Sequence, residues 1–299
     1  MARLLWQQRQ DIGPAPRTYA GTAYESSATR TLLFGGWTDT DGPFFADTWA
    51  WDGEEWVQLA DTGPSARVAN MAYDSTRNVV VLFGGTGDTG DSFDTWEWDG
   101  EGWTQIENSG PQAPWFSSNL TYDAARQVTV LESGSASSFG GKGTWAWDGN
   151  AWTQLADTGP PTRTVFALAY DTPRERVVLF GGRDTTTFQL EQDTWEWDGV
   201  VWKQVEDVGP SQRQGAGMVG TDDGLLLFGG TDGGDLFGDT WAWDGEHWRQ
   251  RQDMGPSPRH TPAMAWDTAR DRAVLFGGVS PNPTGSLMVG DTWEAFETS

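Results

Sequence analysis

The chain has 299 residues, and its 43 acidic and 19 basic side chains give a formal net charge of −24 at pH 7. Because nucleic-acid phosphates and anionic lipid headgroups attract basic surfaces, this charge argues against a nucleic-acid partner and against binding to a membrane surface. Cysteine is absent, so disulfides are excluded, and 20 tryptophans are present, which we attribute to packing within a repeated unit.

The first predicted element is a strand over residues 3–9, whose apolar patch is Leu4 to Trp6. This patch is too short for the core of a signal peptide, and no segment is apolar over the length of a transmembrane helix. We therefore expect a cytoplasmic protein, or a secreted one if a leader has been removed. The Trp-x-Gln pattern of this strand returns at Trp56, Trp103, Trp152, Trp202 and Trp248.

From residue 17 onward the sequence repeats one unit with a period of 48 or 49 residues. In the second copy, the apolar run Val68 to Tyr73 leads through a polar turn to the run Val79 to Phe83 and a double glycine. The alternating segment Thr95 to Trp98, the hairpin signal Asp99-Gly100 and the segment Trp103 to Ile106 complete the copy. Each copy therefore predicts four short strands, which is typical of one blade of a β-propeller.

Six such copies fill the chain, because the degraded phrase from Leu131 to Gly134 occupies the one place where Leu-Phe-Gly-Gly is missing. We predict a single all-β domain over residues 1–299, a six-bladed β-propeller of four-stranded blades. The blades are expected at approximately 17–59, 67–106, 115–155, 163–205, 213–251 and 259–296. Since the last copy ends at its third strand, residues 3–9 are expected to pair beside residues 291–296 and close the ring, which leaves no open strand edge.

These phrases resemble the kelch-repeat family in its bacterial form, whose marks are a double glycine after an apolar strand and spaced aromatic residues downstream. The resemblance covers almost the whole chain and implies a kelch-type propeller. It implies little about activity, because one fold hosts many functions. In kelch-like proteins the variable loops generally form the binding face. Here those loops would be residues 37–46, 86–93, 135–142, 183–192, 231–238 and 279–290.

Arginine occurs at a fixed step after a Gly-Pro phrase in five copies, where the innermost strand should begin. One hypothesis is a basic ring at the channel mouth that binds an anion or an acidic peptide, as the resemblance to kelch adaptor proteins makes plausible. The other is a structural ion pair with the aspartate of Asp-Thr-Trp, because the third copy lacks both partners and carries Trp115 and Gly143 instead. The expected pairs are Arg17–Asp47, Arg67–Asp94, Arg163–Asp193, Arg213–Asp239 and Arg259–Asp291.

The third copy also carries Glu132 where the other copies have phenylalanine. A carboxyl group in an apolar site would have a raised pKa and could serve as a general acid or base, so Glu132 is a catalytic candidate. The alternative is a decayed repeat in which Glu132 turns to solvent or pairs with Lys142. The two histidines, His247 and His260, lie far apart in the repeat pattern, so we predict no metal site and no cofactor.

We favour a non-enzymatic scaffold that presents its variable loops and channel mouth to a protein, a peptide or a small ligand. The ligand-binding candidates are the five arginines, Trp115 and Trp37. One alternative is a sugar-active enzyme resembling the kelch-fold sialic acid mutarotase, with Glu132 and the mouth arginines as its acid–base residues. Another is a carbohydrate-binding propeller that uses exposed aromatic side chains. We expect a monomer whose partner is a protein or acidic peptide, or a saccharide.

Overall fold

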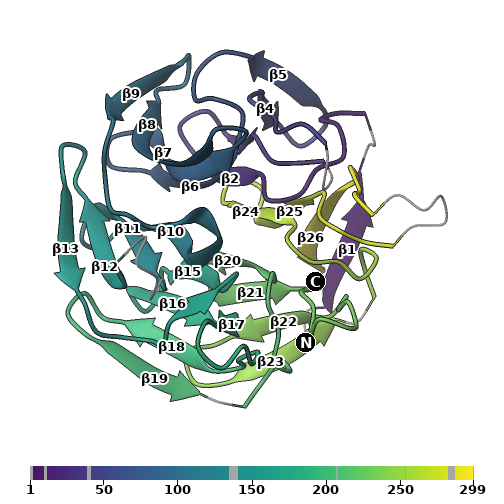
Figure 1. The fold of residues 1–299 in the computed structure, drawn as a ribbon. Coiled ribbons are helices and arrows are strands. Elements are labelled where there is room, and N and C mark those ends of the chain that lie inside the picture. The colour runs from purple at the N-terminus through teal and green to yellow at the C-terminus, as the bar shows by residue number, and fades with distance from the viewer. Residues whose placement is uncertain are drawn as a thin grey trace.

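The computed structural model describes residues 3–9, 12–38, 42–134, 141–206, 208–252, 254–281 and 287–298. Six antiparallel sheets of four strands each stand in a ring around a central channel (Figure 1). The predicted all-β, six-bladed propeller with four-stranded blades is therefore confirmed. The described part of the chain contains no helix that is long and apolar enough to cross a membrane.

The first three blades each run from the channel outward in chain order. Blade 1 contains β2 (Gly21–Glu25), β3 (Arg30–Phe34), β4 (Thr48–Trp51) and β5 (Trp56–Ala60). Blade 2 contains β6 (Val68–Asp74), β7 (Val79–Gly87), β8 (Gly90–Trp98) and β9 (Trp103–Glu107). A short 3₁₀ turn, η1 (Trp115–Ser117), precedes blade 3. Blade 3 contains β10 (Ser118–Asp123), β11 (Val128–Ser133), β12 (Gly143–Trp147) and β13 (Trp152–Ala156).

Blades 4 and 5 have the same order. Blade 4 contains β15 (Ala167–Asp171), β16 (Arg176–Phe180), β18 (Thr194–Trp197) and β19 (Trp202–Glu206), with a separate small ribbon of β14 (Arg163–Thr164) and β17 (Arg183–Asp184). Blade 5 contains β20 (Gly217–Thr221), β21 (Gly224–Phe228), β22 (Thr240–Trp243) and β23 (Trp248–Gln252). We call the side of the ring with the loops after the double glycines the loop face, and the side with the Asp-x-x-Arg turns the turn face.

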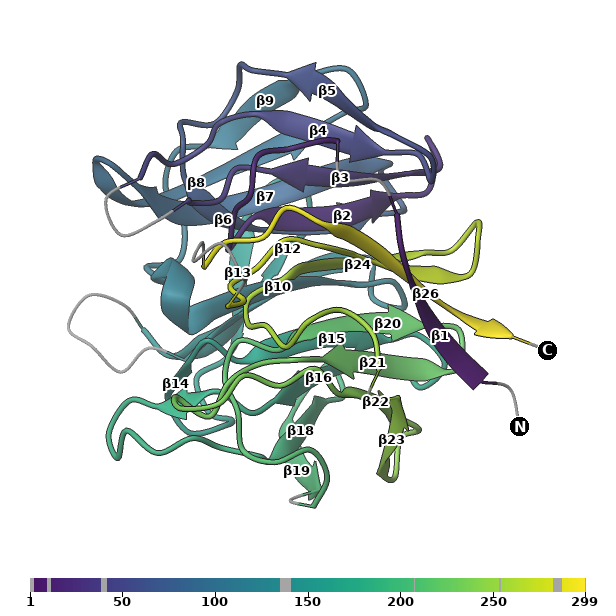
Figure 2. The ribbon, with the colours of Figure 1, turned by 90° about the vertical axis from the view of Figure 1, so that its right-hand side faces the viewer.

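Blade 6 is assembled from both ends of the chain. It contains β24 (Ala263–Asp267), β25 (Arg272–Phe276), β26 (Thr292–Thr298) and β1 (Arg3–Gln8). The outer strand β1 pairs antiparallel with β26 from Arg3 opposite Thr298 to Gln8 opposite Trp293, and Figure 2 shows the two strands side by side. The expected closure by the N-terminal strand is confirmed, and β1 covers the edge of β26 that would otherwise be unpaired.

A repeated contact between phenylalanine and tryptophan joins neighbouring blades. Phe83, the last apolar residue of β7, packs against Trp152 of the next blade with ring centroids 4.8 Å apart. The indole nitrogen of Trp152 donates a hydrogen bond to the Thr95 hydroxyl of blade 2 at 2.8 Å. The same indole-to-threonine bond occurs at the other five interfaces, as Trp6–Thr240, Trp56–Thr292, Trp103–Thr48, Trp202–Thr144 and Trp248–Thr194. This role explains why every outer strand contains a tryptophan.

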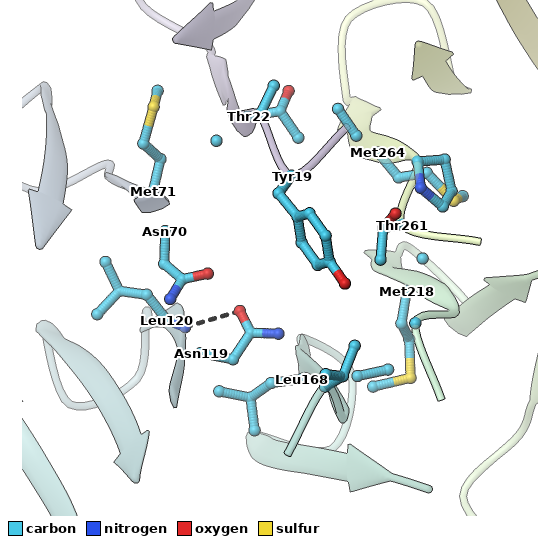
Figure 3. A pocket seen from close by; sticks show the side chains of 18 of the residues that line it. Tyr19, Thr22, Asn70, Met71, Asn119, Leu120, Leu168, Met218, Thr261 and Met264 are labelled. Atoms are coloured by element: carbon cyan, nitrogen blue, oxygen red, sulfur yellow. Dashed lines mark hydrogen bonds between the residues drawn. The ribbon is translucent and has the colours of Figure 1, made fainter. Parts of the chain in front are cut away.

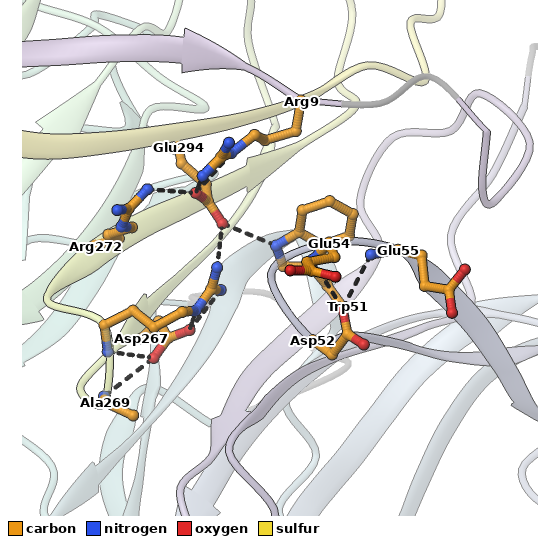
Figure 4. A network of polar contacts seen from close by, with 10 residues as sticks. Arg9, Trp51, Asp52, Glu54, Glu55, Asp267, Ala269, Arg272 and Glu294 are labelled. Atoms are coloured by element: carbon orange, nitrogen blue, oxygen red, sulfur yellow. Dashed lines mark hydrogen bonds and ion pairs between the residues drawn. The ribbon is translucent and has the colours of Figure 1, made fainter.

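A buried carboxylate fixes the seam between blade 6 and blade 1 (Figure 4). Glu294 of β26 accepts hydrogen bonds from Arg9 at 2.8 Å, from Arg270 at 2.6 Å, from Arg272 at 3.0 Å and from the Trp51 indole at 3.0 Å. Burial alone would raise the pKa of Glu294, but the bonds from Trp51, Arg9 and Arg270 outweigh it and lower the pKa. The network therefore ties the N-terminal segment to both blades.

Candidate binding site

Six equivalent side chains, one from each innermost strand, border the channel at its middle. They are Thr22, Met71, Leu120, Leu168, Met218 and Met264. These residues line two cavities at once, one of about 190 Å³ that opens toward the loop face and one of about 360 Å³ toward the turn face. We call the first the mouth cavity, because it lies among the segments that follow the five arginines.

The mouth cavity has an uncharged lining (Figure 3). Its aromatic side chains are Tyr19, Trp115, Phe116 and Phe166, and its polar groups include the amides of Asn70 and Asn119 and the hydroxyls of Ser118 and Thr261. None of the described residues that line it is acidic or basic. Its one group that titrates is the Tyr19 phenol, and burial raises the pKa of that phenol. The cavity thus offers apolar surface and neutral hydrogen-bonding groups.

Two aromatic side chains from blades 1 and 3 meet at this mouth. Tyr19 has a left-handed backbone, with φ of 54°, and its ring reaches across the opening in Figure 3. The ring makes an edge contact with Trp115 at a centroid distance of 4.6 Å. Trp115 is brought there by η1, which takes the place that an arginine turn has in the other five blades. The irregularity of the third copy therefore builds part of the site.

The five arginines are buried in ion pairs with the expected aspartates, so the predicted pairing is confirmed. Their exposed fractions are between 0 and 4 %. The pairs, with N–O distances of 2.5 or 2.6 Å, are Arg17–Asp47, Arg67–Asp94, Arg163–Asp193, Arg213–Asp239 and Arg259–Asp291. None of these arginines lines the mouth cavity. They stand behind its wall rather than in the opening where the basic-ring hypothesis would need them.

In the blade 6 pair, Arg259 and Asp291 make hydrogen bonds to the surrounding protein as well as to each other. Arg259 donates to both carboxylate oxygens of Asp291, to the carbonyl of Gly277 at 3.0 Å and to the carbonyl of Ser257 at 3.0 Å. Asp291 also accepts from the Trp293 indole at 2.7 Å. Burial alone would raise the pKa of Asp291, but the hydrogen bond and charge of Arg259 outweigh it and lower the pKa.

Blade 3 shows what is lost without this pair. Gly143 stands where the other blades have aspartate, and the indole nitrogen of Trp145, two residues later, is buried without a hydrogen-bond partner among the described residues. In blade 6 the corresponding indole, that of Trp293, is satisfied by Asp291. The joint absence of arginine and aspartate in the third copy therefore has a direct structural counterpart.

Glu132 lies in the interface between blades 3 and 4, away from the mouth cavity. Its exposed fraction is 2 %, so the expectation that it turns to solvent is wrong. Burial raises its pKa to about 7, against the opposing effects of a 2.7 Å hydrogen bond from Thr144 and of the nearby Lys142 charge. The Lys142 ammonium donates to the carbonyl of Gly159 at 3.2 Å. Since Glu132 does not line the mouth cavity, it does not reach a ligand held there.

Trp37 lies on the loop face outside the mouth cavity. Its ring stacks on Phe44 at a centroid distance of 5.9 Å and an interplanar angle of 15°, and its indole donates to the carbonyl of Gly42 at 3.2 Å. Residues 39–41 of this acidic loop lie outside the described residues, as do parts of two other variable loops, residues 135–140 and 282–286.

The described residues contain no group of three or more histidine, cysteine or acidic side chains placed to hold a metal ion. No protein-family model matches the sequence, and no curated protein matches it. The protein is therefore defined by its structure, as a six-bladed β-propeller with an uncharged aromatic cavity at one mouth of its channel.

Proposed function

We propose that the protein is a non-enzymatic binding module that holds a small uncharged ligand in the mouth cavity, with the loop face as its recognition surface. The observation that carries this proposal is the lining itself, whose described residues combine aromatic faces and neutral polar groups without an acid or a base. Burying a charged ligand group in such a lining would leave the charge unpaired, which costs several kcal/mol. A neutral ligand avoids this cost.

The same lining favours binding over catalysis. General acid–base catalysis needs a titrating group within hydrogen-bond reach of the reacting atom. Among the described residues of its lining, the mouth cavity supplies only the Tyr19 phenol, whose raised pKa keeps it protonated near neutral pH. An acidic peptide is also disfavoured, because the arginines that would bind it are already paired with aspartates. We further infer that the blades are kelch-type repeats, on the basis of their double glycines and spaced aromatic residues.

The size of the mouth cavity limits the ligand to about one ring. Its volume is about 190 Å³, and an apolar cavity of about 150 Å³ in another protein accommodates benzene. Tyr19 and Trp115 would provide aromatic surface for such a ring, since ring contacts are favourable at centroid distances of about 4.5–7 Å. The ligand of this proposal is therefore a single neutral ring with polar substituents, or one such group of a larger molecule.

A thermal-shift screen of the intact protein tests this proposal. The panel contains uncharged ring compounds, including neutral sugars and cyclic amides, together with acidic sugars, small carboxylates and calcium. Uncharged compounds are expected to raise the melting temperature, because a ligand at 100 times its Kd adds about 2.7 kcal/mol to the unfolding free energy. Shifts with the anions or with calcium alone would contradict the proposal.

Trp115→Ala is expected to weaken binding of the best uncharged compound at least tenfold, or by about 1.4 kcal/mol, because it removes aromatic surface from the cavity wall. Isothermal titration calorimetry would measure the change. Trp37→Ala is the matched control, since Trp37 is also a partly exposed tryptophan of the loop face but lies outside the cavity. Equal losses in the two variants would move the site to the outer loops and would favour a saccharide platform at Trp37 and Phe44.

A further inference from the structure

Two asparagines occupy a position of the innermost strand where the other four blades have glycine or alanine. Asn70 lies opposite Phe83 in blade 2, and Asn119 lies opposite Glu132 in blade 3. The equivalent residues of the other blades are Gly21, Ala167, Gly217 and Ala263. Both asparagines line the mouth cavity, and Figure 3 shows their amide groups directed toward the channel axis. Packing between blades does not require these asparagines, because the other four blades pack without a side-chain amide at this position.

Hydrogen bonds to the backbone fix how each amide is turned. Nδ2 of Asn70 donates to the carbonyl of Ser118 at 3.1 Å. Oδ1 of Asn119 accepts from the amide of Leu120 at 2.8 Å, and its Nδ2 donates to the carbonyl of Phe166 at 3.3 Å. These bonds identify the oxygen and nitrogen of each group, because the reversed orientation would bring two donors or two acceptors together.

Both amides have hydrogen-bonding positions left over, because an asparagine side chain has two N–H donors and an oxygen acceptor. Oδ1 of Asn70 accepts no hydrogen bond from the described residues, and the second N–H of Asn119 donates none. Since Asn70 bonds to Ser118, the residue directly before Asn119, the two amides are neighbours. The cavity wall therefore presents an unused acceptor and an unused donor on two neighbouring amides from adjacent blades.

We propose that Asn70 and Asn119 recognise a ring that carries an N–H and a C=O side by side, as a cyclic amide or imide does. This inference rests on the proposed binding function and names its ligand class. The ring N–H would donate to Oδ1 of Asn70, and the ring carbonyl would accept from Nδ2 of Asn119. Such a ring is uncharged and matches the size of the mouth cavity, and Tyr19 and Trp115 lie on the same cavity wall.

The two hydrogen bonds to Asn70 and Asn119 would make the site bind a ring amide and also discriminate against analogues that lack the N–H. A site built to bond a ligand N–H rejects an analogue that lacks it, because the buried acceptor is then left unpaired. A methyl group on the ring nitrogen removes the donor and adds bulk at the same point. The intact protein is therefore expected to bind 2-piperidone at least tenfold more tightly than N-methyl-2-piperidone.

Calorimetric titration with these two compounds tests the inference, together with Asn70→Ala and the control Asn108→Ala. Asn70→Ala is expected to fold, because alanine occupies the equivalent position in blades 4 and 6, and to bind 2-piperidone at least tenfold more weakly. Asn108 lies just after the outer strand β9 and is exposed, so Asn108→Ala is expected to bind like the parent.

Three results would overturn the inference. They are equal affinity for the N-methyl compound, unchanged affinity in Asn70→Ala, and no binding of 2-piperidone at millimolar concentration. If 2-piperidone does not bind but another uncharged ring compound binds in a Trp115-dependent way, the amide inference fails and the proposed binding function stands. If no uncharged compound binds, both fail.

Discussion

Deletion of residues 1–10 is expected to remove most of the folding stability of the protein, because the deleted strand is the outer strand of blade 6. Leu4 is 3 % exposed and packs with Phe228 and Leu275, and Trp6 packs against Phe228 with ring centroids 5.2 Å apart. Truncating a buried leucine costs about 2–5 kcal/mol and a fully buried tryptophan about 3–5 kcal/mol, the latter being an upper bound for the half-buried Trp6. Their sum approaches the total stability of a typical domain, which is about 5–15 kcal/mol.

The deletion also breaks polar contacts of the seam. The Trp6 indole would no longer donate to Thr240, and Arg9 would no longer neutralise the buried Glu294. Thermal melting followed by near-UV circular dichroism would measure the loss. A synthetic peptide of residues 1–12, added in excess, is expected to restore part of the melting temperature by pairing with β26. A truncated protein that melts like the full chain would contradict closure by this strand.

Glu132→Gln is expected to stabilise the protein in a pH-dependent manner. The pKa of Glu132 is raised from 4.5 to about 7 by burial, so the folded protein holds the proton more tightly than the unfolded chain does. The contribution of this group to stability is therefore greatest below pH 4.5, falls as the pH rises to 7, and stays low above pH 7. A shift of this size corresponds to about 3 kcal/mol as an order of magnitude.

The measurement is the unfolding free energy of the parent and of Glu132→Gln in urea at pH 4, 6 and 8. Relative to the parent, the variant is expected to gain about 3 kcal/mol more at pH 8 than at pH 4. The other carboxyl groups titrate in both proteins and cancel in this difference. A constant difference across the three pH values would show that Glu132 does not carry the proton. Glu132→Phe, which restores the contact with tryptophan seen between Phe83 and Trp152, is expected to gain about 1–2 kcal/mol at neutral pH.

The fold could be predicted from the sequence because the same pattern of apolar, alternating and turn residues occurs six times. Each strand has its own marks, such as the apolar run that ends at Phe83 or the alternation from Thr95 to Trp98, and both became strands with the expected pairing. The ion pairs could also be predicted, since arginine and aspartate are absent together from the third copy. A single sequence can thus reveal an ion pair when one copy of a repeat lacks both the arginine and the aspartate.

The site was harder to predict because it depends on the directions in which individual side chains point, and the sequence does not show these directions. Arg17 and Tyr19 are only two residues apart, yet Arg17 is buried in an ion pair and Tyr19 lines the cavity. The left-handed backbone at Tyr19 turns its side chain toward the cavity. A tyrosine in the sequence does not predict that backbone conformation. The asparagine pair did leave a signal, because Asn70 and Asn119 replace glycine or alanine when the six copies are aligned.

The most direct test of the uncharged site is the affinity of the best uncharged compound, measured by calorimetry at low and at high salt. The affinity is expected to be the same in 20 mM and in 500 mM sodium chloride, because none of the described residues that line the cavity carries a charge for salt to screen. An affinity that falls severalfold at high salt would mean that charged side chains hold the ligand, and it would contradict the uncharged site.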